Sequence, residues 1–282
     1  MKAFGPIVIG ASGGSGTRVI SEILIRSGVY LGQDLNKAND NLLFTYLFKR
    51  PGRFAKDLDS LDPMHKEIFA VHEKLLLGKT PSRVSEFKVI LRAGWDHVYN
   101  FRRYNWKWIL QRLLKIVRSK PLDPIIWGWK EPNTVFFLHG LRAYCPSAKF
   151  ILVLRNGLDM AYSKNDQQLR YWSTYFQMDY NDLSPQNMFE YWYRLNKWAI
   201  VTGRNLFADD FLVVRHEDLC LRRDAAMQEL FDFIGIDINK ISSHVRELPQ
   251  LPRSYGRYRK FDTKWIDSEV RRKLADLGYE VA

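Results

Sequence analysis

The stretch from residue 6 to residue 24 constrains the fold of this chain more than any other. An apolar run, Pro-Ile-Val-Ile-Gly, leads through a glycine-rich turn into a second apolar segment with helical spacing, so the expected order is strand, loop, helix. Glycines at 10, 13, 14 and 16 permit positive φ and close backbone approach. Free N–H groups at the start of the helix would then bind an anion. The expected binding residues are Gly13, Gly14, Ser15, Gly16, Thr17 and Arg18. The alternative is a loop that only turns the chain.

This loop departs from the P-loop of nucleoside triphosphatases. That pattern requires Gly, four residues, Gly, Lys and then Ser or Thr. Here Ala11 lies five positions before Gly16, and Thr17 stands where the lysine is required. The positive charge must come from elsewhere, with Arg18 nearest, and the nucleotide need not be ATP. A P-loop nucleoside or sugar kinase remains an alternative function, although this chain lacks the lysine that the P-loop of such kinases carries.

Composition places the chain in one α/β domain of 282 residues, with 46% hydrophobic residues for a core. A net charge of +12 favours an anionic partner: nucleic acid, an anionic lipid surface or a phosphorylated cofactor. Cys145 and Cys220 are far apart and form no CxxC, which indicates a reducing compartment. The first strand begins by about residue 6, and no apolar run approaches the ~18 residues of a membrane span. We therefore expect a cytoplasmic protein.

Further strands are expected at 28–32, 124–129, 149–154 and 211–214, and strand–helix–strand spacing predicts a central parallel sheet. Helices are expected at 185–206, 222–235 and 264–276, and the region from about 39 to 120 is expected to be helical, with prolines as breakers. Around residues 106–118, one helical face is apolar and the other basic. The apolar face comprises Trp106, Ile109, Leu110, Leu113, Leu114 and Val117, and the basic face comprises Lys107, Arg112, Lys115 and Arg118. We expect the apolar face to pack on the core and the basic face to be solvated, with a membrane or partner surface as the alternative.

Charged side chains follow two of the expected strands. Lys130 and Glu131 follow the strand at 124–129, and Arg155 follows the strand at 149–154. Because ligands of open parallel sheets bind beyond the carboxyl ends of the strands, Arg155 is placed to grip a phosphate. Ser163 lies two helical turns further on and supplies a hydroxyl for the same group. An ordinary salt bridge is the alternative for Arg155. Asn133 or Thr134 is the expected cap of the helix that begins after Glu131.

Four phrases together carry a family resemblance. The phrase from Leu154 to Ser163 resembles the 3′-phosphate motif of sulfotransferases that use 3′-phosphoadenosine-5′-phosphosulfate (PAPS), and Ser15-Gly16-Thr17 resembles their 5′-phosphosulfate loop. The phrase from Val214 to Leu219 looks like the family's "VRYEDL", and that from Gly256 to Lys260 looks like the basic C-terminal loop that closes over the cofactor. Order and spacing agree from about residue 6 to 262. The match is poor at about 50–124, where the family's acceptor-binding inserts vary.

The resemblance implies transfer of a sulfuryl group from PAPS to a hydroxyl or amine of a small-molecule or glycan acceptor. Arg155, Ser163, Arg257 and Lys260 would join the loop in binding PAPS. Many members carry lysine or arginine before Ser-Gly-Thr, but this chain has Gly14, so we assign the catalytic cation to Arg18 or Lys130. Glu131 is the expected general base, with His65, His72 and His97 as competitors. Because Lys130 and Glu131 are neighbours at a strand end, their side chains are expected to point to opposite sides.

The remaining patterns favour ordinary structure. Asp57, Asp59 and Asp62 suggest a calcium loop, but Ile68 replaces its last carboxylate, so no metal site is expected. A non-enzymatic nucleic-acid binder is the third function weighed, because one basic aromatic cluster contains Arg102, Arg103, Trp106, Lys107 and Trp108. A helix that packs its tryptophans inward is the simpler interpretation. Aromatic residues at 171–176 and 191–193 are expected to be core rather than an acceptor pocket.

Overall fold

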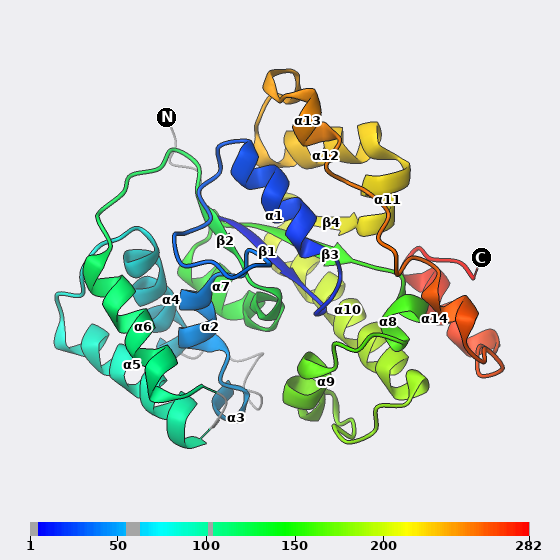
Figure 1. The fold of residues 1–282 in the computed structure, drawn as a ribbon, viewed down its shortest axis with the longest axis horizontal. Helices are drawn as coiled ribbons and strands as arrows, with labels where there is room; N and C mark the ends of the chain where they lie inside the picture. The colour runs from blue at the N-terminus through cyan, green and yellow to red at the C-terminus, as the bar shows by residue number, and fades with distance from the viewer. Residues whose placement is uncertain (1–4, 55–62, 101–103, 282) are drawn as a thin grey trace.

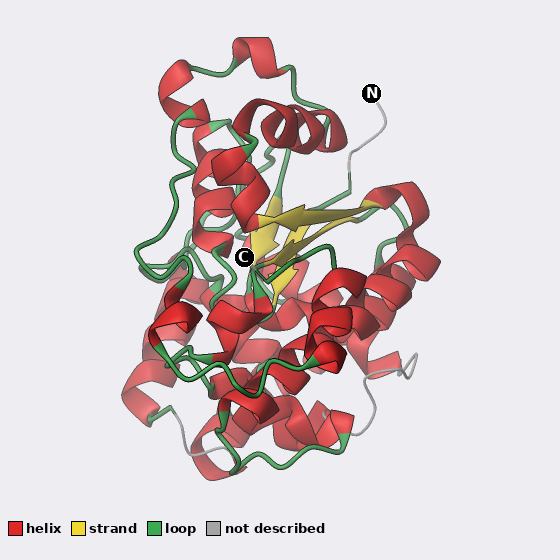
Figure 2. Cartoon of the chain, turned by 90° about the vertical axis from the view of Figure 1, so that its right-hand side faces the viewer, coloured by secondary structure: helices red, strands yellow, loops and turns green. Residues whose placement is uncertain are grey.

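The fold is a four-stranded parallel sheet between two layers of helices (Figures 1 and 2). The computed structural model describes residues 5–54, 63–100 and 104–281; Asp57, Asp59, Asp62, Arg102 and Arg103 lie outside this part of the chain. The strands are β1 (Ile7–Ala11), β2 (Gly128–Lys130), β3 (Lys149–Leu154) and β4 (Phe211–Arg215), in the order β2-β1-β3-β4. All pairs are parallel, with Ile9 opposite both Lys130 and Ile151. The expected α/β class with a central parallel sheet is confirmed.

Alternate residues of the central strands pack on opposite faces of the sheet, as the period of two requires. Ile9 and Ile151 contribute to a core with α1 (Thr17–Arg26) and α12 (Arg223–Ile234). Val8 and Phe150 face a larger core on the other side, which is rich in aromatic rings. This second layer contains α2 (Leu42–Phe48), α4 (Pro63–Leu76), α7 (Leu138–Tyr144) and α10 (Pro185–Phe207).

The remaining described helices complete the two layers and the C-terminal segment. They are α3 (Pro51–Phe54), α5 (Val84–Trp95), α6 (Trp106–Arg118), α8 (Gly157–Ala161), α9 (Gln167–Trp172), α11 (His216–Leu221), α13 (Ser243–Arg246) and α14 (Ser268–Asp276). A π-helical turn, η1 (Asp96–Asn100), follows α5, and a 3₁₀ turn, η6 (Arg257–Lys260), precedes α14. None of the helices in the described ranges has the length and apolar character that crossing a bilayer requires.

The strand at 149–154 and the helices near 185–206 and 222–235 lie where the sequence predicts them. The strand predicted at 28–32 is wrong: only Tyr30 makes a bridge, to Trp127, because Gly28 and Gly32 have φ of 89° and 105° and interrupt the extended backbone. The strand predicted from residue 124 begins only at Gly128. Its partner β1 starts opposite that residue, at Ile7, and Pro124 has no N–H for a ladder.

The helical turn after β2 is capped by Glu131, not by Asn133 or Thr134. The Glu131 carboxylate accepts a hydrogen bond of 2.6 Å from the backbone N–H of Asn133, and Pro132 occupies the first position of the turn, where no N–H is needed. The turn is 3₁₀ over Pro132–Phe137 before α7 begins. A residue expected only to do chemistry therefore also holds local structure.

Helix α6 follows the expected orientation only in part: Ile109 is buried and Lys107, Lys115 and Arg118 are exposed, as predicted, but other residues of both faces are not. Trp106, Leu110 and Val117 are 55%, 56% and 76% exposed, whereas the helix buries Ile109, Ile116 and the predicted solvent-facing Arg112. The physical reason is the buried carboxylate of Asp34, which forms a 2.8 Å ion pair with Arg112 and so neutralises the guanidinium inside the protein. The apolar stripe of α6 is consequently on the surface.

Candidate functional site

The loop after β1 forms a glycine-dependent cradle at the N-terminus of α1. Gly14 and Gly16 have φ of 97° and 84°, in the left-handed region that favours glycine. A Cβ on Gly16 would lie 2.7 Å from Cδ2 of the His216 ring, which leaves no room for a side chain. The conformation of Gly14 also explains why this position does not carry the lysine or arginine that the resemblance leads one to expect.

Gln168 holds the cradle from α9. Its side-chain oxygen accepts a 2.7 Å hydrogen bond from the N–H of Gly13, and its amide nitrogen donates to the carbonyl of Ala11 at 3.1 Å. Ser15 is fully buried, and within the described chain its hydroxyl oxygen has no hydrogen-bond partner. In the described ranges no side chain caps the N-terminus of α1. The cradle thus carries hydrogen-bond donors that lack a full set of acceptors within the described part of the protein and that a bound anion could use.

A pocket of about 340 Å³ opens over this cradle. Lys130, the last residue of β2, and Glu131, which follows it, line the pocket together with the loop, so the structure brings the two predicted clusters together. Arg18 lies at the exposed rim. The other residues that line the pocket are Ala38, Asp40, Lys49, Pro132, Asn133, Asn165, Gln167 and Gln168. Of these, only Asn133 is predicted from the sequence to have a role, as a helix cap.

Lys130 is nearly buried, with 2% of its side chain exposed. Its ammonium donates to the carbonyl of Ala38 at 2.9 Å and forms a short ion pair with Asp40. Asp40 belongs to the irregular segment before α2, where no sequence pattern marks it. The ion pair keeps a charged lysine at the carboxyl end of β2.

Glu131 is 2% exposed, and burial raises the pKa of its carboxyl group. Lys49 opposes this shift and Asp40 reinforces it, while the N–H and the side-chain amide of Asn133 donate to the two carboxylate oxygens. Lys130 and Glu131 line the same pocket. The strand ends at Lys130, so the alternation of a strand does not extend to Glu131, and the expectation that the two side chains point to opposite sides stays a prediction.

A second basic site lies at the end of β3. Arg155 is 7% exposed, and it donates to the carbonyl of Gly14 at 3.3 Å and to the hydroxyl of Ser254 at 2.6 Å. Its buried Nε has no hydrogen-bond partner in the described part of the chain. Burial and the nearby Arg257 both lower the pKa of Arg155, although Asp159 favours its charge. A bound anion would offset the electrostatic repulsion between the guanidinium groups of Arg155 and Arg257.

Asp159 in α8 fixes the C-terminal basic segment next to Arg155. Its carboxylate accepts from the N–H of Gly256 at 2.9 Å and from that of Tyr258 at 3.4 Å. Arg257 donates to the carbonyl of Tyr162 at 3.1 Å, one residue before Ser163. The hydroxyl oxygen of Ser163 accepts from the N–H of Asn165 at 3.1 Å. The structure therefore gathers Arg155 and Arg257 around the segment that carries Ser163, and it leaves Lys260 exposed at the end of η6.

The three histidines considered as bases are buried among aromatic rings. His72 lies edge-on to Trp129, with ring centroids 4.8 Å apart, and desolvation lowers its pKa to about 3. Desolvation lowers the pKa of His97 to about 4, and His65 packs on Phe137. None of the three is among the described residues that line the pocket over the cradle.

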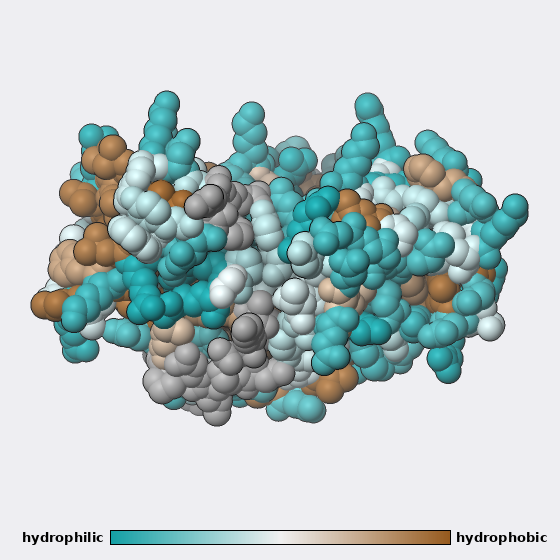
Figure 3. Space-filling view, turned by 90° about the horizontal axis from the view of Figure 1, so that it is seen from below, coloured by the Kyte–Doolittle hydropathy of each residue, from teal (hydrophilic) through white to brown (hydrophobic). Residues whose placement is uncertain are grey.

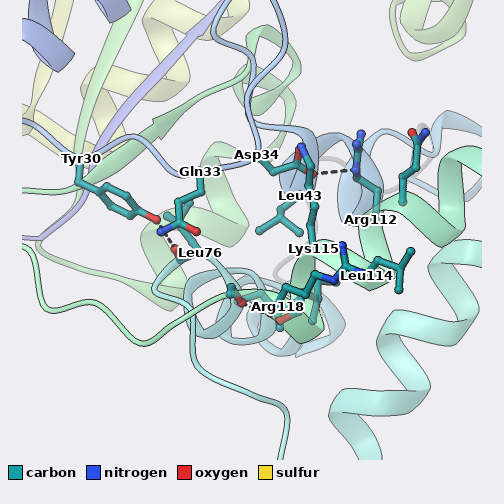
Figure 4. A pocket seen from close by; sticks show the side chains of 13 residues that line it. Tyr30, Gln33, Asp34, Leu43, Leu76, Arg112, Leu114, Lys115 and Arg118 are labelled. Carbon is teal, nitrogen blue, oxygen red and sulfur yellow. Dashed lines mark hydrogen bonds and ion pairs between the residues drawn. The ribbon is translucent and has the colours of Figure 1, made fainter.

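A larger hollow of about 620 Å³ lies elsewhere, along α6 (Figure 4). Its floor is apolar, with Leu43 and Leu76, and the Asp34 ion pairs lie at its side. It shares no lining residue with the cradle pocket. We therefore assign the candidate site to the smaller pocket, where the glycine loop and the strand-end charges meet.

Comparison with known proteins identifies one family. The profile of the sulfotransferase family matches residues 6–240, which include the cradle, Lys130, Glu131, Arg155 and Ser163 but not Arg257 and Lys260. A search of curated proteins found no match.

Solved structures of sulfotransferases are similar in fold. The sulfotransferase domain of the curacin biosynthetic pathway aligns with a TM-score of 0.51 at 12% identity, covering 100% of both chains. The sulfotransferase domain of the Synechococcus PCC 7002 olefin synthase aligns with a TM-score of 0.45 at 15% identity, covering 100% of this chain and 98% of that one. A sulfotransferase from Mycobacterium avium gives 0.42 at 10% identity, with coverage of 93% and 70%.

Proposed function

Since this chain belongs to the sulfotransferase family, we propose that it transfers a sulfuryl group from PAPS to a hydroxyl or amine of a small-molecule or glycan acceptor. The observation that favours PAPS as the donor is the presence of two candidate anion-binding sites, the glycine cradle and the basic cluster around Arg155. They are joined by the hydrogen bond from Arg155 to the carbonyl of Gly14. A donor with phosphates at both its 5′ and 3′ ends needs two such binding sites. Membership in the family replaces the kinase and the nucleic-acid binder as interpretations.

The residues present fit PAPS. The left-handed Gly14 and Gly16 open the cradle to a phosphate, and the uncapped start of α1 directs N–H groups at it. The buried Nε of Arg155 and the hydroxyl of Ser15 are donors whose hydrogen-bonding capacity the described protein leaves unused. We propose that Gly13, Gly14, Ser15, Gly16, Thr17 and Arg18 hold the 5′ end. Arg155, Ser163, Arg257 and Lys260 would then hold the 3′-phosphate.

Lys130 is proposed as the catalytic cation. PAPS, when bound, supplies an activated sulfuryl group whose departure leaves negative charge on the 5′-phosphate. An ammonium fixed at the end of β2 by Asp40 and the Ala38 carbonyl is preorganised for charge that develops beside the cradle. Arg18 at the rim is the alternative catalytic cation of this pocket, which Lys49 also lines.

Glu131 is proposed as the general base. Its raised pKa makes the carboxylate a better proton acceptor than an exposed glutamate, and it lines the same pocket as Lys130. The hydrogen bonds from Asn133 fix the orientation of the carboxylate. The proton of the acceptor hydroxyl would pass to Glu131 as the oxygen attacks the sulfur in line.

The acceptor would enter beside the irregular segments that close the pocket. These segments supply Ala38, Asp40, Lys49, Asn165 and Gln167 to the lining, whereas the described part of the helical segment 50–124 supplies none of the lining residues. That segment remains the proposed acceptor-side insert of a domain spanning 1–282, acting further from the reacting atoms. The free thiols of Cys145 and Cys220 favour a cytoplasmic site of action.

The direct test is transfer of radiolabelled sulfate from PAPS to a library of sugars, phenols and lipids, combined with thermal unfolding in nucleotides. We expect labelled product and stabilisation by adenosine 3′,5′-bisphosphate but not by ATP with magnesium. Stabilisation by ATP with magnesium alone would contradict the proposed donor.

A further inference from the structure

The α5–α6 face is an exposed apolar surface that contributes no residue to the pocket over the cradle. We define this face by the side chains of Val84, Phe87, Leu91, Trp95, Tyr99, Trp106, Leu110, Leu114 and Val117, which are 42–76% exposed. Figure 3 shows hydrophobic residues gathered at the left end of the molecule, the end at which Figure 1 places α5 and α6. Single exposed apolar residues are ordinary, but a run of this size marks an interaction surface.

The two helices present one continuous face. On α5 the residues 84, 87, 91 and 95 recur with helical spacing, and on α6 the residues 106, 110, 114 and 117 do the same. Aromatic rings join them: the centroids of Trp95 and Tyr99 are 4.1 Å apart, and those of Tyr99 and Trp106 are 6.2 Å apart.

The charges around this face are of one sign. The exposed charged residues in the described part of 83–120 are all basic, and they are Arg83, Lys88, Arg92, Lys107, Lys115, Arg118 and Lys120. The two acidic residues there are neutralised by ion pairs, Glu86 with Lys74 and Asp96 with Arg50. An apolar stripe bordered by cations complements an anionic surface that is itself apolar beneath its charges.

We propose that the α5–α6 face binds peripherally to an anionic lipid bilayer. Tryptophan and tyrosine favour the level of the headgroups, leucine and valine favour the acyl boundary, and lysine and arginine attract anionic headgroups. A symmetric dimer through this face would bring the basic borders of two copies together, which favours the lipid over a second copy. The hollow of Figure 4 likewise combines apolar and basic side chains of α6, since Leu114, Lys115 and Arg118 line it.

Flotation of the full-length protein with lipid vesicles tests the proposal. We expect binding to vesicles of phosphatidylcholine with 30% phosphatidylserine, at least tenfold weaker binding to phosphatidylcholine alone, and release as sodium chloride rises from 0.1 to 0.5 M. Intrinsic fluorescence should shift to the blue on binding as Trp95 and Trp106 leave water. Failure of the wild-type protein to float with anionic vesicles at 0.1 M salt would overturn the proposal.

Paired surface variants localise the binding. Leu110→Glu and Lys107→Glu on the face should each weaken vesicle binding about fivefold or more. The matched substitutions Leu221→Glu and Lys240→Glu, at exposed positions elsewhere, should leave it unchanged. Equal effects of Leu110→Glu and Leu221→Glu would overturn the assignment to this face. The proposal would also be overturned if the wild-type protein were a dimer that does not bind vesicles and if Leu110→Glu dissociated this dimer, as measured by light scattering. Sulfuryl transfer to a water-soluble acceptor, measured without lipid, is independent of all these outcomes.

Discussion

Among single residues, Lys130 is the proposed source of charge neutralisation in the reaction. Lys130→Met should lower kcat by roughly 10²-fold or more, the scale of a lost transition-state donor, while changing the affinity for adenosine 3′,5′-bisphosphate only a few-fold. Lys149→Met is the matched control, because Lys149 begins β3 at the amino end of the parallel strands, away from the carboxyl ends that carry the site, and donates to the carbonyl of Phe233. Steady-state kinetics with nucleotide titrations checks both. A Lys130→Met enzyme of normal kcat would move the catalytic cation to Arg18.

The carboxyl group of Glu131 should set the acid limb of the pH–rate profile. Burial raises its pKa above the ordinary 4.5, and a base acts only when deprotonated, so kcat should fall as the pH drops through this raised pKa. Glu131→Gln should remove the limb along with most of the activity. A Glu131→Gln enzyme with normal activity and an unchanged profile would leave Glu131 only its role as the cap of the turn at 132–137.

At the scale of elements, the cradle depends on the left-handed glycine that begins α1. Gly16→Ala should abolish binding of adenosine 3′,5′-bisphosphate, because the new Cβ meets the His216 ring and moves the helix N-terminus away from the phosphate. Gly28→Ala, just beyond the other end of α1, is the matched control: its φ of 89° imposes similar strain, but nothing lies within 4 Å of the added Cβ. Isothermal titration calorimetry should separate the two. Loss of binding in both variants would indicate general destabilisation.

The layer of aromatic rings beside the sheet should make folding stability dependent on pH through its neutral histidines. His72 and His97 have folded pKa values of about 3 and about 4, whereas the unfolded chain takes up their protons near the ordinary 6.5. Stability should therefore be greatest above pH 6.5 and fall as the pH drops below it, by about 1.4 kcal/mol per pH unit for each histidine. Urea unfolding between pH 7 and 5 measures this slope. His72→Gln should reduce it and the exposed His244→Gln should not; identical slopes for the two would contradict the explanation.

Local sequence predicts those elements whose determinants are local. The strand at 149–154 is a continuous apolar run, and the loop at 10–16 is marked by its glycines, so both are found where expected. The strand at 124–129 is shortened because pairing depends on where β1 begins, which is a tertiary fact. The burial of Arg112 in α6 is not predictable from the helix for the same reason, since the carboxylate that pairs with Arg112 lies at position 34 and no pattern within the helix reveals it.

At the scale of the whole molecule, the candidate site joins segments that are distant in the sequence. Lys130 meets Asp40, Gly13 meets Gln168, and Arg155 meets Ser254. Motif phrases predicted one member of each pair, because those members follow strands or belong to the glycine loop. Asp40, Gln168 and Ser254 lie in irregular or ordinary helical segments, so only the assembled fold places them at the site.

In the proposed function, the glycine cradle and the basic cluster around Arg155 together form one binding site for a nucleotide with phosphates at both ends. The most direct measurement is calorimetric titration of wild-type protein and Arg155→Ala with adenosine 3′,5′-bisphosphate and with adenosine 5′-phosphate. We expect Arg155→Ala to weaken binding of the bisphosphate by about 1.5–3 kcal/mol, the range of a charge-assisted hydrogen bond, and to leave binding of the monophosphate almost unchanged. Equal weakening of both ligands would contradict it, because Arg155 would then not bind the 3′-phosphate.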